Sequence, residues 1–488
     1  MSSQDQYAGL VSPQLHADDA DVCQRRTSFP IRTDPLQDDK ATEIKLLSVA
    51  RPHMRAFHYA WLSFFFAFFG WFSIPPLMPT IKKQLGLTAD QVSNSNIVSV
   101  ASRRSNPRGF SFTRNELHGT HVCSILHRSG RLFLHCDDVL DIDHVWTSTM
   151  FSKEVVGSAN ALAAGWGNLG AGATTLITPQ LFNLVTTGGA LSDNMGWRVA
   201  LLFPAFFMVI TGIALYFNSD DCPQGQYKDL RRNYAIDATA RKPAVDMKQG
   251  LLRVAKLPVT WILAFQYACS FGVELQVHNV LTEYYYEDFT YSNCDPATDV
   301  NECRRLTQSR ATLISSLFGL MCIFARALGG YISDVGNRRC GMKGRIGVQF
   351  VSFAGQAVFL YLYSTTTNLA SSISLLIFFG IFVQACTGST YGIVPYVLPA
   401  FTGATSGFVG AGGNVGALCW SLMFKGIGKR GMSFKYLSIF VAVAALATLG
   451  IKVPGNAALW EKVDSAHDGL APTEVDDESV HNGKQTVI

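Results

Sequence analysis

Residues 165–172 read Gly-Trp-Gly-Asn-Leu-Gly-Ala-Gly, and residues 410–416 read Gly-Ala-Gly-Gly-Asn-Val-Gly. Both stretches lie inside long apolar segments, and both contain the order Gly-Asn-aliphatic-Gly. The asparagines, Asn168 and Asn414, are separated by about half of the chain. Such spacing is typical of membrane proteins made of two duplicated halves around a site at the middle of the bilayer. The paired stretches therefore predict two related helical bundles.

The apolar segments around these stretches are long enough to cross a membrane. A helix of about 20 apolar residues covers a hydrocarbon core of about 30 Å. The chain has 488 residues, of which 48% are hydrophobic and 16% are charged. The sequence therefore predicts an all-α polytopic membrane protein. The clear spans are 57–80, 157–183, 197–217, 259–282, 311–333, 346–364, 371–394, 402–424 and 434–453.

The distribution of positive residues predicts the orientation of these spans. Lys and Arg crowd 228–256 and 338–345, which the positive-inside rule places in the cytoplasm. The loop 284–308 is richer in acids and is expected outside, so that both termini are cytoplasmic. One loop disagrees, because alternation puts it outside although it is basic. Its positive residues are Lys425, Lys429, Arg430 and Lys435.

Two further predictions concern the residues of the outer loop. Cys294 and Cys303 share it, and a disulfide between them is open on the sequence alone. Tyr284, Tyr285 and Tyr286 are expected at the membrane interface, where tyrosine is enriched.

We expect the chain to divide into five parts. They are a disordered cytoplasmic tail (1–55), an N-terminal bundle (56–217), a cytoplasmic linker (218–257), a C-terminal bundle (258–453) and an acidic cytoplasmic tail (454–488). Within the N-terminal bundle, residues 102–144 are anomalous. An odd number of crossings must lie between the first two clear spans, yet this segment holds no 18-residue apolar stretch.

Two charged residues lie inside predicted spans. Arg326 is too far from the end of its span for its guanidinium to reach the membrane surface. A buried guanidinium needs an anion, and its fork of N–H groups matches the oxygens of nitrate, nitrite or a carboxylate. An ion pair with Glu274 is the alternative. Glu274 could instead carry a coupling proton, because burial disfavours an ionised carboxylate.

The glycines around each asparagine allow a neighbouring helix or a ligand to approach the backbone closely. Helix packing is the simpler explanation, whereas the duplicated amides suit a small planar anion. The candidates on this second interpretation are Gly167, Gly170, Gly413 and Gly416 together with the two asparagines.

These segments, together with FGVEL at 271–275 and WFSIPPLMPTIKKQLGL at 71–87, resemble the nitrate/nitrite porter family of the major facilitator superfamily. The likeness is greatest to the eukaryotic high-affinity nitrate transporters, and it covers about 57–101 and 145–453. It implies 12 helices in two six-helix bundles, with helices 2 and 3 disrupted here. It also implies alternating access, nitrate or nitrite as substrate, proton symport and a place in the plasma membrane.

The resemblance also implies a substrate site. In that family two arginines, from the second and eighth helices, and an aromatic pair from the seventh hold the anion. Arg326 matches the eighth-helix arginine, and Tyr267 and Phe271 match the aromatic pair. Asn168 and Asn414 match the signature asparagines. The motif Gly330-x-x-x-Asp334 with Arg338 and Arg339 resembles a gating loop of the superfamily. An ordinary basic cytoplasmic loop is the alternative interpretation.

The segment 102–144 departs from the family pattern. The second-helix arginine would fall near Pro107, and Arg108 is a poor equivalent in its polar surroundings. The pattern resumes at Val145. Our hypothesis is an out-of-frame or mis-spliced translation, since a shifted frame replaces apolar residues with a mixture. A metal-binding insertion is the competing interpretation, but the His and Cys spacing there fits no finger pattern.

Other function classes find little support. The spans contain no nucleophile–base set, phosphate loop or redox-metal spacing, so neither an enzyme nor a cofactor is expected. The net charge of +4 is spread over loops and tails, which argues against a nucleic-acid partner. The expected partners are nitrate or nitrite, protons and the lipid bilayer, and an accessory membrane subunit is left open. The alternatives are a non-transporting nitrate sensor, an inactive mis-spliced product, and a transporter of another small anion.

Overall fold

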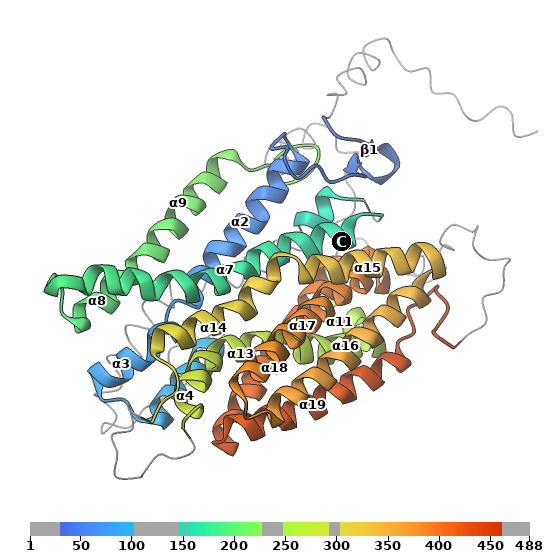
Figure 1. Ribbon diagram of the computed structural model, residues 1–488. Helices are drawn as coiled ribbons and strands as arrows, with labels where there is room; N and C mark the ends of the chain where they lie inside the picture. Colours follow the sequence, from blue (N-terminus) through green and yellow to red (C-terminus); the bar gives the residue numbers. More distant parts are fainter. Residues whose placement is uncertain (1–29, 102–145, 153, 227–246, 292–302, 461–488) are drawn as a thin grey trace, which may run out of the picture.

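The computed structural model describes residues 30–101, 146–152, 154–226, 247–291 and 303–460. Its described part is almost entirely helical (Figure 1). The strands form one short antiparallel ribbon, β1 (Thr33–Asp34) with β2 (Lys40–Ala41). The expectation of an all-α protein is therefore confirmed.

In the first half of the chain, α2 (His53–Trp71), α7 (Val156–Thr186) and α9 (Leu202–Asn218) lie side by side, at the blue and green end of the colour scale (Figure 1). Helix α2 contacts both α7 and α9. Two prolines follow α2, and they interrupt its hydrogen bonds before the chain continues into α3. The elements are η1 (Pro35–Gln37), α2 (His53–Trp71), η2 (Pro75–Leu77), α3 (Met78–Leu85), α4 (Ala89–Ala101), α7 (Val156–Thr186), η4 (Thr187–Gly189), α8 (Asp193–Ala200) and α9 (Leu202–Asn218).

The second half contributes the remaining helices. One continuous rod passes through two π-helical turns: α12 (Pro258–Tyr267), η6 (Ala268–Gly272), α13 (Val273–Glu283) and η7 (Tyr284–Asp288). A second rod has a break: α14 (Gln308–Leu320), η8 (Met321–Ile323) and α15 (Ala325–Cys340). The other elements are α11 (Met247–Lys256), α16 (Met342–Thr365), α17 (Leu369–Val397), η9 (Pro399–Phe401), α18 (Thr402–Ile427), α19 (Arg430–Ala447) and η10 (Thr448–Gly450).

Each of the nine predicted spans coincides with one of these helices or rods. In the described residues, 7 helices are long and apolar enough to cross a membrane. Helix α7 and the α12–η7 rod are not among them, because both carry many polar or small residues. Helix α7 contacts α14, α15 and α17 of the other half. These two polar elements therefore pack against other helices of the protein, and they supply most of the residues of the site described below.

We call the end of the bundle with His53 and Gly450 the tail end, and the end with Leu85 and Arg430 the opposite end. At the tail end, residues 30–52 correct one expectation, because they do not form a disordered tail. Ile31 and Ala41 are buried in a cluster with the first turns of α2 and with Phe151. The expectation for residues 1–29 lies outside the described part of the chain.

The tyrosines of η7 correct a second expectation. Tyr284 and Tyr285 are 5% and 0% exposed and belong to the core of the second half, so the prediction of an interfacial belt was wrong for them. The hydroxyl of Tyr285 lies 3.0 Å from that of Ser372. Cys303 is in a disulfide. Its candidate partner, Cys294, lies outside the described residues.

Candidate functional site

Arg326 is the second residue of α15, directly after the break in the α14–α15 rod. Its side chain is 1% exposed. Its Nη2 donates to the Tyr267 hydroxyl at 3.2 Å, while Nε and Nη1 have no hydrogen-bond partner. In the described part of the chain no carboxylate forms an ion pair with it. The site therefore contains a buried cation with free donors, which is costly unless an anion is bound.

An aromatic pair forms the wall beside this guanidinium. Tyr267 ends α12 and Phe271 lies in the π-helical turn, four residues later, where their rings stack with centroids 5.1 Å apart and an interplanar angle of 15°. The guanidinium carbon of Arg326 is 5.8 Å from the centre of the Phe271 ring. Gly413 lies directly behind, since an added Cβ would be 2.7 Å from Tyr267 and 2.8 Å from Phe271. Helix α18 thus holds both rings in place.

Glu274 is the second buried charge-bearing side chain of the site, and it is 0% exposed. Its Oε1 accepts a hydrogen bond from Nδ2 of Asn168 at 2.7 Å, and the Cys322 thiol lies 3.6 Å from the same oxygen. Its Oε2 has no hydrogen-bond partner. Because Asn168 belongs to α7 and Glu274 to α13, this bond joins the two halves. The alternative of an Arg326–Glu274 ion pair is not formed in this structure.

A contact between the halves closes the tail end. Asp334 of α15 forms an ion pair with Arg345 of α16 at 2.8 Å, and the two side chains are 2% and 1% exposed. The Ser158 hydroxyl of α7 donates to the same carboxylate at 2.5 Å. We call these three residues the tail-end lock.

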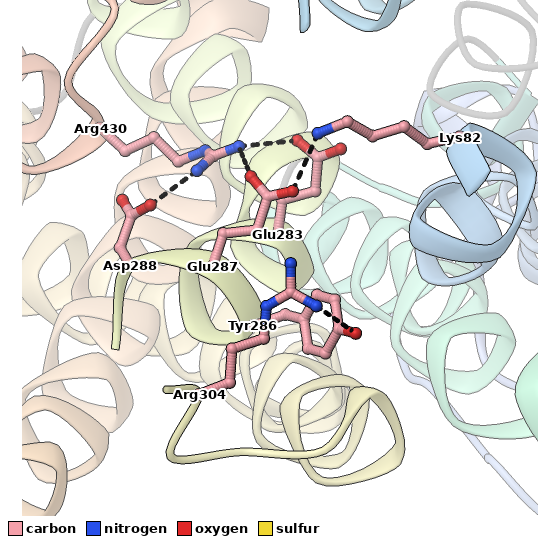
Figure 2. A network of polar contacts seen from close by, with 7 residues as sticks. All are labelled: Lys82, Glu283, Tyr286, Glu287, Asp288, Arg304 and Arg430. Carbon is pink, nitrogen blue, oxygen red and sulfur yellow. Dashed lines mark hydrogen bonds and ion pairs between the residues drawn. The ribbon is translucent and has the colours of Figure 1, made fainter. Parts of the chain in front are cut away.

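A second contact between the halves closes the opposite end (Figure 2). Lys82 of α3 pairs with Glu287 at 3.0 Å. Arg430 pairs with Glu283, Glu287 and Asp288 at 3.1, 2.9 and 2.7 Å. We call these five residues the opposite-end lock. Burial acts to raise the pKa of Glu287, but Lys82 and Arg430 outweigh it and hold that pKa below its ordinary value. Arg430, one of the four positive residues of the basic loop, is therefore paired with acids of the α12–η7 rod.

Comparison with known proteins identifies the family. The sequence profile described as Major Facilitator Superfamily matches residues 144–421, more than half of the chain. This chain belongs to the major facilitator superfamily. It is thus a membrane transporter and not an enzyme.

Curated relatives narrow this assignment within the major facilitator superfamily. High affinity nitrate transporter 2.5 of Arabidopsis thaliana is 34% identical over 82% of this chain and 78% of the relative. High-affinity nitrate transporter 2.3 of Oryza sativa subsp. japonica is 34% identical over 86% and 82%. Nitrate transporter 2.2 of Chlamydomonas reinhardtii is 30% identical over 86% and 83%. The chain is therefore a member of their family, as the sequence motifs predicted.

Solved structures agree on the major facilitator fold. The proton:xylose symporter XylE has a TM-score of 0.51 at 11% identity, over 80% of this chain and 94% of that one. A bacterial homologue of the lysosomal transporter Spinster has a TM-score of 0.50 at 12% identity, over 82% and 97%. At these identities the likeness concerns the fold alone.

The structure brings five of the predicted site residues of this major facilitator protein together: Arg326, Tyr267, Phe271, Glu274 and Asn168. Asn414 differs, because it is half-buried and its Nδ2 donates to the backbone oxygen of Gly410 on its own helix at 3.0 Å. Within the described residues it shares no hydrogen bond with the other five.

The glycines of the two signatures lie at helix contacts. Gly167 faces the ring of Phe64 and Gly170 faces the backbone of Phe65, both on α2. Gly416 lies against Ala268, where an added Cβ would be 2.5 Å from the alanine Cβ. The helix-packing alternative therefore accounts for these three positions, and Gly413 contacts the aromatic pair.

The predicted gating motif lies at the tail end. Gly330 packs against Ala161 of α7, and Asp334 is part of the tail-end lock, whereas Arg338 and Arg339 are exposed in the last turn of α15. Sequence reasoning missed Arg345 by assigning it to a basic loop. A buried acid followed by an arginine across a single glycine turn, Gly341, was the available signal.

One further residue was predicted for the family site, the second-helix arginine. The position expected for the second-helix arginine, near Pro107, lies outside the described residues. The profile match begins at residue 144, next to Val145, where the family pattern was expected to resume.

Proposed function

We propose that this chain carries nitrate across a membrane together with protons, by alternating access. The observation that carries the proposal is the buried Arg326, with two unpartnered nitrogens beside a stacked aromatic pair. Its relatives are named nitrate transporters. Nitrite has the same charge and similar oxygen geometry, so it is the second substrate of the same site.

The residues around Arg326 suit a small planar anion. The guanidinium supplies charge and N–H donors, and the Tyr267 hydroxyl is already within its reach. The ring of Phe271 offers a flat apolar surface for the face of the anion. Asn168 and Asn414 remain candidates for further amide donors, with Gly413 supporting the rings. The three signature glycines at helix contacts, Gly167, Gly170 and Gly416, act in this proposal by holding the walls of the site.

Glu274 is our candidate for the coupling group. Arg326 is one positive charge and can balance one negative charge at a time. If Glu274 is ionised it competes with nitrate for the field of Arg326, so protonation of Glu274 favours nitrate binding. The anion and the proton then enter together, and deprotonation of Glu274 helps to expel nitrate on the other side.

The two locks are our candidate gates. Each joins the first half of the chain to the second, so opening one end requires breaking its lock while the other persists. We assign the tail end to the cytoplasm, because Arg338 and Arg339 are exposed there. Both termini are then cytoplasmic. In this proposal the chain lies in the plasma membrane, as the family resemblance implies. An accessory membrane subunit stays an open part of this proposal.

The proposal is tested by uptake of isotopically labelled nitrate at several external pH values in a cell that lacks its own nitrate transport. The chain should give saturable uptake that rises as the external pH falls. Arg326→Ala should abolish the saturable part, while Arg310→Ala, at an exposed arginine of α14 on the same rod, serves as the matched control. Unchanged kinetics in Arg326→Ala would refute the assignment of the site.

A second candidate is a non-transporting product of the same gene, and the start of the profile match at residue 144 favours it. We propose that residues 102–144 are an out-of-frame or mis-spliced translation. Sequencing the transcript tests this directly. A restored version that transports while the chain as written does not would support this candidate. Nitrate binding without flux by the chain as written would instead indicate a sensor.

A further inference from the structure

Gln384 of α17 is a fully buried amide at the site. Its side chain is 0% exposed, and neither Oε1 nor Nε2 has a hydrogen-bond partner in the described structure. Buried amides are normally hydrogen-bonded, because an unpaired polar group away from water is costly. An exception of this kind requires an explanation.

The surroundings of Gln384 are fixed by close packing of α17 on α15. Gly388, one turn further on, lies against the backbone oxygen of Arg326, and Ala385 lies against Gly329. The amide of Gln384 lies close enough to the carboxyl group of Glu274 to interact with it, although no hydrogen bond of ordinary geometry joins the two. Two unpartnered groups are therefore neighbours: the Gln384 amide and Oε2 of Glu274.

Other buried glutamines of the same half have partners. Nε2 of Gln266 donates to Thr448 at 2.7 Å, and Nε2 of Gln349 donates to Thr390 at 2.7 Å. Nε2 of Gln356 donates to the backbone oxygen of Cys269 at 2.8 Å. Each of these three amides thus has at least one partner, whereas both polar atoms of the Gln384 amide lack one.

We propose that Gln384 is a positioning residue that stabilises both protonation states of Glu274. When Glu274 is protonated, its Oε2–H donates to Oε1 of Gln384. When Glu274 is ionised, the amide rotates and its Nε2–H donates to the carboxylate. An amide has both a donor and an acceptor and can serve either state. The proton itself moves between Glu274 and water, and the amide neither gains nor loses one.

The other groups that face Glu274 cannot take this role. Asn168 of α7 already donates to Oε1, and Cys322 of η8 faces the same oxygen. Arg326 of α15 carries only donors. On the same rod, Tyr267 bonds Arg326, and His278, one turn further on, packs between the rings of Phe72 and Phe318. The inference deepens the proposed function, since it rests on Glu274 as the coupling group.

Infrared difference spectroscopy on the purified full chain tests the inference without requiring transport. The carbonyl stretch of a protonated carboxyl group is assigned to Glu274 by its loss in Glu274→Gln. Gln384→Met keeps the side-chain length but removes donor and acceptor, so that band should shift in frequency. Gln356→Met is the matched control at a buried glutamine that donates to the backbone oxygen of Cys269 and not to Glu274, and the band should stay unchanged. A Glu274 band that is identical in Gln384→Met and the wild type overturns the inference, as does the absence of any such band.

Two additions keep the test decisive. Gln384→Asn retains a shorter amide and should shift the band less than Gln384→Met does. Where the wild type transports nitrate, Gln384→Met should lower uptake by about tenfold or more, since hydrogen bonds to charged groups are the stronger ones. If the wild type does not transport, the proposed function fails on uptake while the spectrum still decides the role of Gln384.

Discussion

Arg326 and Arg345 are both among the largest fully buried side chains of the molecule, and they lie in opposite situations. Arg345 pairs with Asp334 at 2.8 Å and also donates to the Ser333 hydroxyl at 3.3 Å. Arg326 has the Tyr267 hydroxyl as its one hydrogen-bond partner in the described structure, and two of its nitrogens have none.

The difference separates a structural charge from a functional one. Burying a cation costs several kcal/mol unless an anion compensates it. At Arg345 the protein supplies that anion, so the pair stabilises the closed tail end. At Arg326 the protein supplies none, so the free energy of compensation is available to a ligand. This comparison leads to five predictions, in order of decreasing effect.

Arg345→Met should lower the free energy of unfolding by about 3–5 kcal/mol, because it leaves the buried carboxylate of Asp334 without a cation. Thermal unfolding of the purified protein in detergent measures this. Arg326→Met is the matched control and should not lower stability, since it removes an unpaired buried charge. Equal losses in the two variants would remove the distinction between the arginines.

Arg326→Met should weaken nitrate binding by about 100-fold, equivalent to about 3 kcal/mol. Equilibrium binding of labelled nitrate to the purified protein measures this loss. Arg326→Lys should recover part of the affinity, because it keeps the charge but not the planar set of donors. Full affinity in Arg326→Met would show that another cation binds the anion.

Gly165→Ala should disturb Arg326 without touching Arg345. An added Cβ would be 2.8 Å from the Cys322 backbone oxygen and 3.2 Å from Cβ of Arg326. Overpacking of this kind costs about 1–3 kcal/mol, and we expect nitrate affinity to fall by about tenfold as α15 shifts. Gly347→Ala on α16 is the control, since nothing lies within 4 Å of its added Cβ. Equal affinities in the two variants would contradict the tight fit of α7 on Arg326.

The two locks should respond differently to the salt concentration. Salt screens exposed charges more strongly at about 1 M than at about 0.1 M. Raising sodium gluconate over this range should therefore weaken the partly exposed opposite-end lock by up to about 1 kcal/mol. The buried Asp334–Arg345 pair should not respond. Stability measured at both concentrations for Glu287→Gln and Asp334→Asn checks this, because only the first substitution should remove the salt dependence.

The opposite-end lock should also make the stability of the protein depend on pH. The pKa of Glu287 is held below its ordinary value, so its stabilisation is present at neutral pH and is lost as the pH falls through the lowered value. Glu287→Gln should abolish that part of the acid dependence. An unaltered acid dependence in this variant would contradict the pairing with Lys82 and Arg430.

The sequence was sufficient to predict the helices and the centre of the site. Hydropathy located the nine spans, and the cost of buried charge directed attention to Arg326 and Glu274. The resemblance added Tyr267 and Phe271. Contacts between distant segments were the part that sequence reasoning missed. Arg345 and Arg430 were assigned to loops because the charge of a basic residue does not by itself identify the acids that the fold brings to it.

Gln384 was missed for a related reason. A glutamine in an apolar segment is usually satisfied by a neighbouring helix, as Gln266 and Gln349 are. Only the packed structure shows that the Gln384 amide has no such partner and lies beside Glu274. The exposure of Tyr284 and Tyr285 was misjudged similarly, because their position at a helix end did not reveal the helices that cover them.

The most direct test of the central claim is simultaneous measurement of nitrate and proton movement in liposomes that contain the purified chain. We predict that an inward nitrate gradient moves labelled nitrate and protons inward together. Arg326→Met should abolish both movements, and Glu274→Gln should abolish the proton movement. Nitrate entry without proton movement in the wild type, or nitrate entry that persists in Arg326→Met, would contradict the account.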